Sequence, residues 1–333
     1  KLNQEIDDIE RMFDVKIEQH DYSFYAEKLR KQKYNLSEAE ITPYLEYKNI
    51  RNAAFYTAKI LFGIDFEKIN DVETWHEDID VFLATKQGAN LGLAYMDPFS
   101  YKGKVSGAWM NTLRSQYLDE KGRVLPLITC NLNLMNGGKD APLLMSWDDV
   151  MTLFHEFGHS LHGLCSNVRY KSLAGTNVVN DYVEFPSQFL ENFFLLDFVI
   201  ITFARHYQTG EVMPQELFKK IRDALTFNQG YSGVEYMICA IADMEAHLTN
   251  DVIDTKTFIK SVFEKYEKPE QVTMRHGFTH FSHLFSNEEY ASKYYCYKWS
   301  AVLSADAFES FDKLKDDPQE FHVLAKKLYD NVF

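Results

Sequence analysis

The strongest periodic pattern in the chain lies between residues 146 and 165. Apolar residues recur there at steps of three and four, which is the spacing of one buried helix face. They are Val150, Leu153, Phe154, Phe157, Leu161 and Leu164. Ser146 and Asp149 have the spacing of a capping box, and acidic residues favour the first turn of a helix. The pattern therefore predicts a helix that begins just after Ser146.

Two histidines lie off this apolar face. His155 and His159 are four residues apart, so one side of the helix can direct both imidazoles to a single ion. Glu156 lies beside them and could hold a metal-bound water. His-Glu-x-x-His on a helix is typical of zinc hydrolases, in which the histidines bind the metal and the glutamate is the general base. The alternative is an amphipathic helix with ordinary surface or core histidines, and a third ligand would decide between the two.

Residues 180–192 offer that third ligand. A catalytic zinc commonly binds two histidines and one carboxylate and leaves a fourth position for water. We expect Glu184 to be the ligand, because Val183 and Phe185 beside it demand burial and a buried carboxylate needs a partner. On a helix, three polar residues would share the face of Glu184 and could orient the histidines. They are Asp181, Gln188 and Glu191.

His162 competes with Glu184 for this role, because it lies one turn beyond His159. The metzincin pattern would have glycine at position 162 and histidine at position 165. This chain has His162 and Cys165 there. We therefore interpret His162 as a packing residue or as an outer neighbour of the ligands.

Helical spacing dominates most of the remaining chain. Helices are predicted at residues 2–13, 22–32, 43–61, 214–227, 236–249 and 255–266. The run from Gln229 to Gly233 is interpreted as a break between two of them. Between residues 79 and 131 the pattern changes to short apolar or alternating runs, which predicts a small sheet placed before the metal-binding helix. Its edge could bind a substrate backbone at residues 106–110, although an ordinary core strand is the alternative.

The predicted fold class is mainly α with a small β-sheet. We expect one domain over residues 1–333, with a helical segment at 1–75, the sheet at 76–135, and zinc-binding and substrate-contacting helices at 136–333.

Composition narrows the possible functions. The formal net charge of −14 argues against a nucleic-acid partner, because phosphates require a basic surface. The four cysteines lack paired spacing, which favours free thiols and a cytoplasmic protein. The most apolar run, residues 193–204, is too short to cross a bilayer, and residues 1–13 do not resemble a signal peptide. We expect no membrane partner.

A second group of polar residues lies at 275–283 and 290–299. If the latter segment is helical, Tyr290, Tyr294 and Tyr297 share one face. A phenol or imidazole donor would stabilise the oxyanion that forms when a peptide carbonyl is attacked. The alternative is a structural aromatic stripe, which is the commoner meaning of this spacing.

Several motifs accompany the predicted metal site. They are His155 to His162, Leu173 to Thr176 and Asp181 to Gln188, with Phe24 to Arg30, Gly107 to Met110 and Tyr294 to Ser300 around them. Together they resemble the thimet oligopeptidase family of zinc peptidases over about residues 20 to 310, most closely its peptidyl-dipeptidases. The resemblance implies a zincin-like metallopeptidase catalytic domain. Three residues match, by position, the family residues that contact substrate and stabilise the transition state. They are His283, Tyr290 and Tyr297.

The resemblance implies one Zn²⁺ per chain and hydrolysis of short, unstructured peptides by a monomer, with release of C-terminal dipeptides. The alternatives are an oligoendopeptidase that cleaves internal bonds and a non-catalytic peptide-binding or scaffold protein. Two departures from the family are visible. The family has a glycine-rich loop where this chain has Ser286 to Glu289, and family members are longer, with an N-terminal helical part. We therefore expect this chain to be the catalytic portion.

Overall fold

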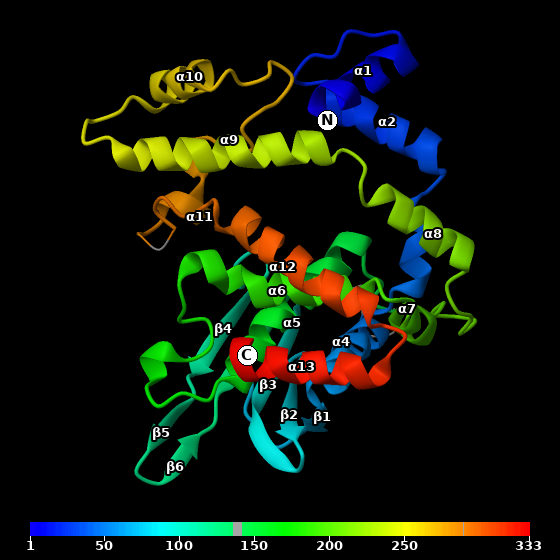
Figure 1. Cartoon of the computed structure of the whole chain (residues 1–333), viewed down its shortest axis with the longest axis vertical. Helices are drawn as coiled ribbons and strands as arrows, with labels where there is room; N and C mark the ends of the chain where they lie inside the picture. Colours follow the sequence, from blue (N-terminus) through cyan, green and yellow to red (C-terminus); the bar gives the residue numbers. More distant parts are fainter. Residues whose placement is uncertain (136–141, 289) are drawn as a thin grey trace. The chain divides into compact units, whose positions relative to one another are not determined.

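The computed structural model describes residues 1–135, 142–288 and 290–333 (Figure 1). Within these ranges the chain forms two compact units, and each unit combines two stretches of sequence. The first unit contains Lys1–Ser37 and Pro214–Lys298, and the second contains Glu38–Met213 and Trp299–Phe333. Compact units can belong to one functional domain, so the single domain stays a prediction. No helix in the described ranges is long and apolar enough to cross a bilayer.

The second unit contains a five-stranded sheet with the order β1-β2-β3-β7-β4. The strands are β1 Ile64–Ile69, β2 Asp80–Lys86, β3 Ala89–Phe99, β4 Trp109–Arg114 and β7 Leu127–Leu134. β3 and β7 are parallel, whereas the other neighbours are antiparallel, and β4 is an edge strand. β5 Tyr117–Asp119 and β6 Gly122–Val124 form a separate pair.

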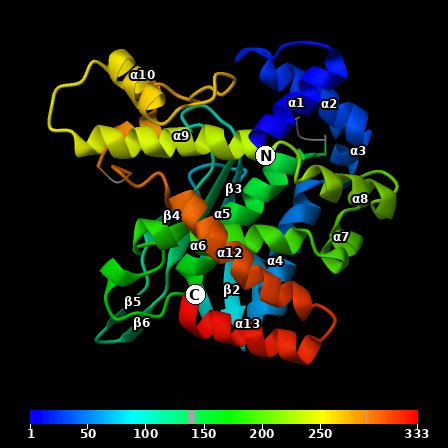
Figure 2. The ribbon, with the colours of Figure 1, turned by 45° about the horizontal axis from the view of Figure 1, so that its top comes forward.

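Helices cover one face of this sheet. They are α3 Glu38–Ile41, α4 Tyr47–Phe62, α5 Trp147–Cys165, α6 Asn180–Phe194, α7 Asp197–Phe203 and α13 Pro318–Val332, with short 3₁₀ turns at Thr42–Tyr44 and Lys171–Leu173. α5 packs against β3, β4 and β7 on one side and against α6 on the other, and Figure 2 shows α5 lying next to β3 and β4. Buried aromatic residues fill this core, among them Phe154, Phe157, Phe189, Phe193 and Phe194.

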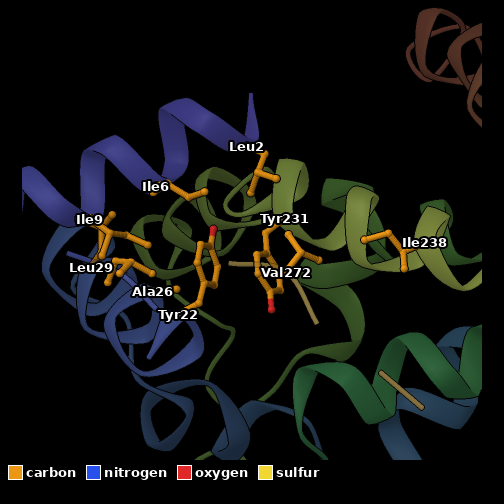
Figure 3. Packing of buried hydrophobic residues seen from close by; sticks show 10 residues of the cluster. Leu2, Ile6, Ile9, Tyr22, Ala26, Leu29, Tyr231, Ile238 and Val272 are labelled. Atoms are coloured by element: carbon orange, nitrogen blue, oxygen red, sulfur yellow. The ribbon is translucent and has the colours of Figure 1, made fainter. Parts of the chain in front are cut away.

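The first unit is helical. It contains α1 Leu2–Phe13, α2 Tyr22–Tyr34, α8 Gln215–Ala224, α9 Gln229–Leu248, α10 Thr255–Lys265, α11 Ser282–Phe285 and a 3₁₀ turn at Phe278–His280. α12 Cys296–Lys313 begins in this unit and continues in the second. Leu2, Ile6 and Ile9 of α1 pack into a cluster in which Tyr22 stacks on Tyr231 at 3.8 Å between ring centres (Figure 3).

The predicted fold class, mainly α with a small sheet, is confirmed. The predicted boundary between the helical segment and the sheet is wrong, because β1 begins at Ile64, directly after α4 ends. The strand β1 spans only six residues, so its alternation of buried and exposed residues is easily missed. The predicted break at Gln229 to Gly233 is also wrong, since these residues form the first turns of α9. A Cβ at Gly230 would lie 2.6 Å from the backbone nitrogen of Leu2, so this glycine permits close helix packing rather than ending a helix.

Candidate metal centre

The helix that carries the two histidines begins as the sequence predicts. Ser146 Oγ accepts a hydrogen bond from the Asp149 backbone N–H at 3.1 Å, and Asp149 Oδ2 accepts one from the Ser146 backbone N–H at 2.9 Å. This capping box starts α5 and satisfies amide groups that have no partner within the helix. α5 continues to Cys165, so His155 and His159 lie within one regular helix.

The structure brings together the three groups that the sequence predicts as metal ligands. Glu184 Oε2 lies 3.1 Å from His155 Nε2 and 3.1 Å from His159 Nε2. All three ligand atoms lie within 4.8 Å of one another. The side chains are 20%, 11% and 5% exposed for His155, His159 and Glu184, so the cluster lies at the edge of the core and remains reachable from solvent.

α6 can bring Glu184 this close because position 158 is glycine. A Cβ at Gly158 would lie 2.6 Å from Ser187 Cα and 2.8 Å from the carbonyl oxygen of Pro186. Either distance is far below a van der Waals contact, so a side chain at this position would push α6 away. The glycine between the two histidines therefore sets the spacing of the two ligand-bearing helices.

Two of these groups, His155 and Glu184, have strongly shifted pKa values. Burial lowers the pKa of His155, but hydrogen bonds to Glu184 and Glu191 outweigh it and raise that pKa to about 10. Burial likewise raises the pKa of Glu184, but hydrogen bonds from His155 and His159 dominate and hold it far below its usual range. Glu184 is therefore a carboxylate, the form in which it can bind a metal cation.

Two further contacts orient these ligands. Glu191 Oε1 accepts a hydrogen bond from His155 Nδ1–H at 2.7 Å, which leaves Nε2 of that imidazole directed toward Glu184. Ser187 Oγ donates to Glu184 Oε2 at 3.0 Å. The sequence predicted the position of Glu191 from its spacing on α6, whereas the role of Ser187 was missed. For Asp181 and Gln188, the role of orienting the histidines stays a prediction.

Glu156 lies beside this cluster and is itself buried. Burial raises the pKa of its carboxyl group, although the nearby histidines and a hydrogen bond from the Met110 backbone act in the opposite direction. Glu156 Oε2 has no hydrogen-bond partner within the described residues. A buried carboxylate oxygen without a partner is unusual, and it provides an acceptor for a water molecule.

His162 does not join the ligand cluster. The group of metal-binding side chains found in the described ranges contains His155, His159 and Glu184 only. His162 is buried near Tyr182, with 6.4 Å between ring centres. Burial, followed by the charge of His159, lowers its pKa to about 4. It is therefore neutral at physiological pH, in agreement with a packing residue.

The donor set suits a divalent metal ion. Two imidazole nitrogens and one carboxylate oxygen are common ligands of catalytic zinc. In a tetrahedral site with ligand bonds of about 2.0–2.2 Å, the ligand atoms lie about 3.3 Å from one another. The 3.1 Å separations between Glu184 Oε2 and the two Nε2 atoms are close to that spacing.

The other predicted site residues form a cluster of their own in the first unit. Tyr297 OH lies 3.1 Å from His283 Nε2 and 3.4 Å from Tyr290 OH. Tyr290 and Tyr297 are half-buried and their rings are parallel, whereas His283 is exposed. The structure thus groups three polar groups that the sequence places up to fourteen residues apart.

The condition for one shared helix face, a helix over residues 290–299, is met only in part, because α12 begins at Cys296 and Tyr290 and Tyr294 precede it. The preceding segment forms turns, and the Ser292 backbone has a φ of 60°. The reason is Asp243 of α9, whose two carboxylate oxygens accept hydrogen bonds from the backbone N–H groups of Ser292 and Tyr294, each at 3.1 Å. Asp243 is 1% exposed and was missed by sequence analysis. A carboxylate directly after the apolar run 238–242 was the available signal. Glu289 of the predicted loop departure lies outside the described residues.

Two helices present a His-His-Glu donor set beside a buried glutamate and an edge strand. This arrangement defines a zincin-like metallopeptidase fold. The family model described as Peptidase family M3 matches residues 1–330, and the chain belongs to this family. Membership implies a divalent metal ion.

Curated relatives agree with this assignment. The chain is 38% identical over 298 residues to dipeptidyl carboxypeptidase of Escherichia coli (strain K12), covering 87% of this chain and 43% of that protein. It is 31% identical over 304 residues to oligopeptidase A of the same organism, covering 88% and 44%. Organellar oligopeptidase A, chloroplastic/mitochondrial, of Arabidopsis thaliana is 35% identical over 306 residues, with 88% and 38% covered. The chain thus spans less than half the length of these relatives.

Proposed function

We propose that the chain is the catalytic portion of a zinc-dependent peptidase that hydrolyses short, unstructured peptides and releases dipeptides from their C-termini. The observation that carries this proposal is the convergence of His155, His159 and Glu184 beside the buried carboxylate of Glu156. The 38% identity to dipeptidyl carboxypeptidase supports the removal of dipeptides. Because the chain covers 43% of that relative, the substrates and activity of the whole protein belong to the proposal.

Zinc held by His155, His159 and Glu184 would polarise both a water molecule and the scissile carbonyl. Glu156 accepts the proton of the attacking water and later passes it to the leaving amine. The burial that raises the pKa of Glu156 makes its carboxylate a better acceptor for the proton of the water. Glu191 holds Nδ1–H of His155 and so directs Nε2 toward the position of the metal, which would displace the Nε2 proton on binding.

We assign His283, Tyr290 and Tyr297 to substrate contact and to stabilisation of the oxyanion. This assignment rests on their positions in the family pattern and on the hydrogen bond between Tyr297 OH and His283 Nε2. Phenol and imidazole groups can both donate to a developing negative charge.

Mass spectrometry of peptide products is the decisive experiment. A peptidyl-dipeptidase should release dipeptides from peptides with free C-termini and should lose rate when the C-terminus is amidated. Equal cleavage of both substrates at internal bonds would instead identify an oligoendopeptidase. The two peptides differ only in one terminal group, so they are matched controls for each other.

The remaining alternative is a peptide-binding or scaffold protein without catalysis. Elemental analysis of the purified, zinc-supplied protein separates it from the enzyme. We expect close to one zinc per chain. A folded protein that binds peptides but retains no zinc and cleaves nothing would favour the scaffold.

A cytoplasmic location and a monomeric state are further parts of the proposal. All four cysteines are buried and free, which supports a reducing compartment. Size-exclusion chromatography with light scattering tests the monomer, because a dimer would double the mass measured for a 38.9 kDa chain.

A further inference from the structure

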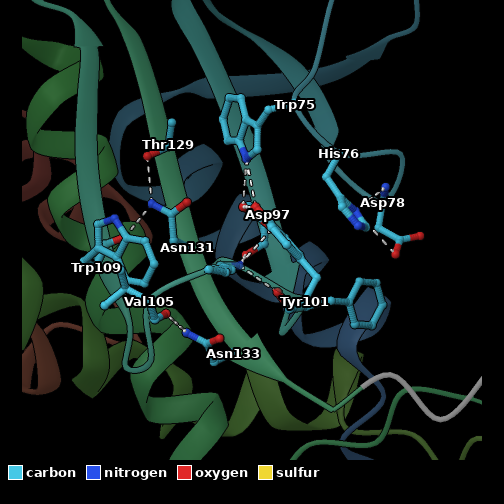
Figure 4. A network of polar contacts seen from close by, with 12 residues as sticks. Trp75, His76, Asp78, Asp97, Tyr101, Val105, Trp109, Thr129, Asn131 and Asn133 are labelled. Atoms are coloured by element: carbon cyan, nitrogen blue, oxygen red, sulfur yellow. Dashed lines mark hydrogen bonds and ion pairs between the residues drawn. The ribbon is translucent and has the colours of Figure 1, made fainter.

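A network of buried polar groups lies beneath the loop that joins β3 to the edge strand β4 (Figure 4). We call this segment, residues 100–108, the β3–β4 loop. Ile128 of β7 faces α5, because a Cβ at Gly163 of α5 would lie 2.7 Å from the Ile128 side chain. Successive residues of a strand point to opposite faces of the sheet. Thr129 and Asn131 of β7 therefore point to the opposite face of the sheet, where the network lies.

Lys104 is the centre of this network. Its ammonium group donates to the carbonyl oxygens of Asp97 and Phe99, each at 2.8 Å, and lies 2.8 Å from Asp97 Oδ1. An ammonium group has three N–H donors, so all three are used. The other carboxylate oxygen of Asp97 accepts hydrogen bonds from Trp75 Nε1 and Tyr101 OH, at 3.2 and 2.8 Å.

Among the ion pairs that lysine and arginine form in the described residues, this one is the most deeply buried. The side chains of Lys104 and Asp97 are each 3% exposed, whereas those of Lys59 and Asp65, which also form a pair, are 60% and 59% exposed. Removing two charges from water is costly, and a buried pair often stabilises a fold no more than apolar residues of the same size would. A geometric role is therefore a better explanation for the Lys104–Asp97 pair than stability alone.

The network also holds the other end of the loop. Asn133 Nδ2 donates to the carbonyl oxygens of Val105 and Gly107, at 2.8 and 2.5 Å. Asn131 Nδ2 donates to the carbonyl oxygen of Trp109, the first residue of β4, at 2.9 Å. The β3–β4 loop is thus held to β3 through Lys104 and to β7 through Asn133, and Asn131 holds the first residue of β4.

The next residue of β4 contacts α5, the helix that carries Glu156. β4 packs against α5, and Met110 Cε would lie only 2.9 Å from a Cβ at Gly163 of that helix. A displacement of the loop would move Trp109 and Met110 together, because they are adjacent. It would therefore also disturb the packing of β4 against the helix that carries Glu156.

We infer that Asp97 and Lys104 are positioning residues, which fix the β3–β4 loop and thereby hold β4 against α5, the helix that carries Glu156. The inference rests on the proposed function, in which Glu156 is the general base. It adds two residues that touch neither the metal ligands nor any group assigned to substrate. Their effect on catalysis passes through the backbone of β4.

The test uses Lys104→Met, with Lys59→Met as the matched control at an exposed ion pair. We expect Lys104→Met to lower kcat at least about tenfold, since small displacements of a reacting group can cost up to about a hundredfold, and to leave the zinc content unchanged. Amide hydrogen exchange of residues 109–114 should become at least several-fold faster than in the parent. Lys59→Met should change neither quantity.

The double variant Asp97→Asn with Lys104→Met removes both charges. It replaces the single variant in the test if the single variant does not fold. We expect it to regain thermal stability while exchange at residues 109–114 stays fast and kcat stays low. Parent-like exchange in β4, with a loss of thermal stability as the sole effect, would overturn the inference. If the parent protein cleaves no peptide, the proposed function fails, whereas the exchange measurement still tests the positioning role.

Discussion

The metal centre and the tyrosine cluster hold their polar groups in different ways. At the metal centre, ligands project from two regular helices, α5 and α6, and Glu191 of the same pair of helices orients His155. In the tyrosine cluster, Tyr290 lies in a turn ahead of α12, and its segment is fixed by one carboxylate from α9, that of Asp243. The geometry of the metal centre therefore depends on the many backbone hydrogen bonds of two helices. The geometry of the tyrosine cluster depends on few hydrogen bonds.

This difference has consequences for substitution. Changes of His155, His159 or Glu184 should act on metal content and on catalysis together, because these side chains would bind the same ion. Changes in the tyrosine cluster should act on catalysis and leave the metal in place. The predictions below test this separation.

Glu184→Ala should have the largest effect. It removes the carboxylate that lies 3.1 Å from both imidazoles, so we expect loss of zinc and of essentially all turnover. Elemental analysis and peptide cleavage measure the two losses. His162→Gln is the contrasting variant and should keep its zinc. Zinc loss in His162→Gln, with zinc retained in Glu184→Ala, would make His162 the third ligand.

Glu156→Gln should abolish turnover and keep the metal. A positioned general base typically contributes about 10²–10⁴-fold, and the amide replaces the carboxylate with little change in volume. Kinetics and zinc content measured on the same sample test the expectation. If zinc is lost together with activity, Glu156 is structural and the proposed role is wrong.

Tyr297→Phe should lower kcat by about a hundred- to thousandfold and leave zinc content unchanged. It removes one hydroxyl, which lies 3.1 Å from His283 Nε2, and little volume. Steady-state kinetics should show a larger change in kcat than in KM, because an oxyanion donor acts mainly in the transition state. A kcat within a few-fold of the parent, with a severe loss in Tyr290→Phe or His283→Ala, would show that Tyr297 is structural.

Glu191→Gln should weaken zinc binding by about 10- to 100-fold, because it weakens the hydrogen bond that orients His155. Competition with a chelating dye measures the change in zinc Kd. Asp181→Asn is the comparison variant, since the sequence predicted the same role for Asp181. Equal effects of both substitutions would mean that the 2.7 Å contact is not what matters.

Asp243→Asn should have the smallest effect on activity. The amide group cannot accept both backbone hydrogen bonds, so we expect a destabilisation of about 1–3 kcal/mol and a kcat reduced by several-fold, with normal zinc content. Chemical unfolding and steady-state kinetics give the two values. A loss of zinc in this variant would contradict the separation between the two clusters.

The sequence predicts the metal centre better than the tyrosine cluster for a physical reason. The positions of His155, His159 and Glu191 follow from helix spacing, and the capping box at Ser146 fixes where α5 begins. The turn before α12 depends on Asp243, which is about fifty residues away in sequence, so local spacing could not decide whether a helix forms there. The contacts of Lys104 with Asp97 were missed for a different reason, since neither residue belongs to a periodic pattern.

The first unit is built from two separate stretches of sequence, and this has a consequence for synthesis on the ribosome. Its helix α1 packs through Leu2, Ile6 and Ile9 against residues of α9, which lie beyond the whole Glu38–Met213 stretch of the second unit. At about 5–20 residues per second, that stretch takes roughly 10 to 35 seconds to translate. During this time α1 can pack only against α2, and the cluster stays incomplete until α9 has left the ribosome.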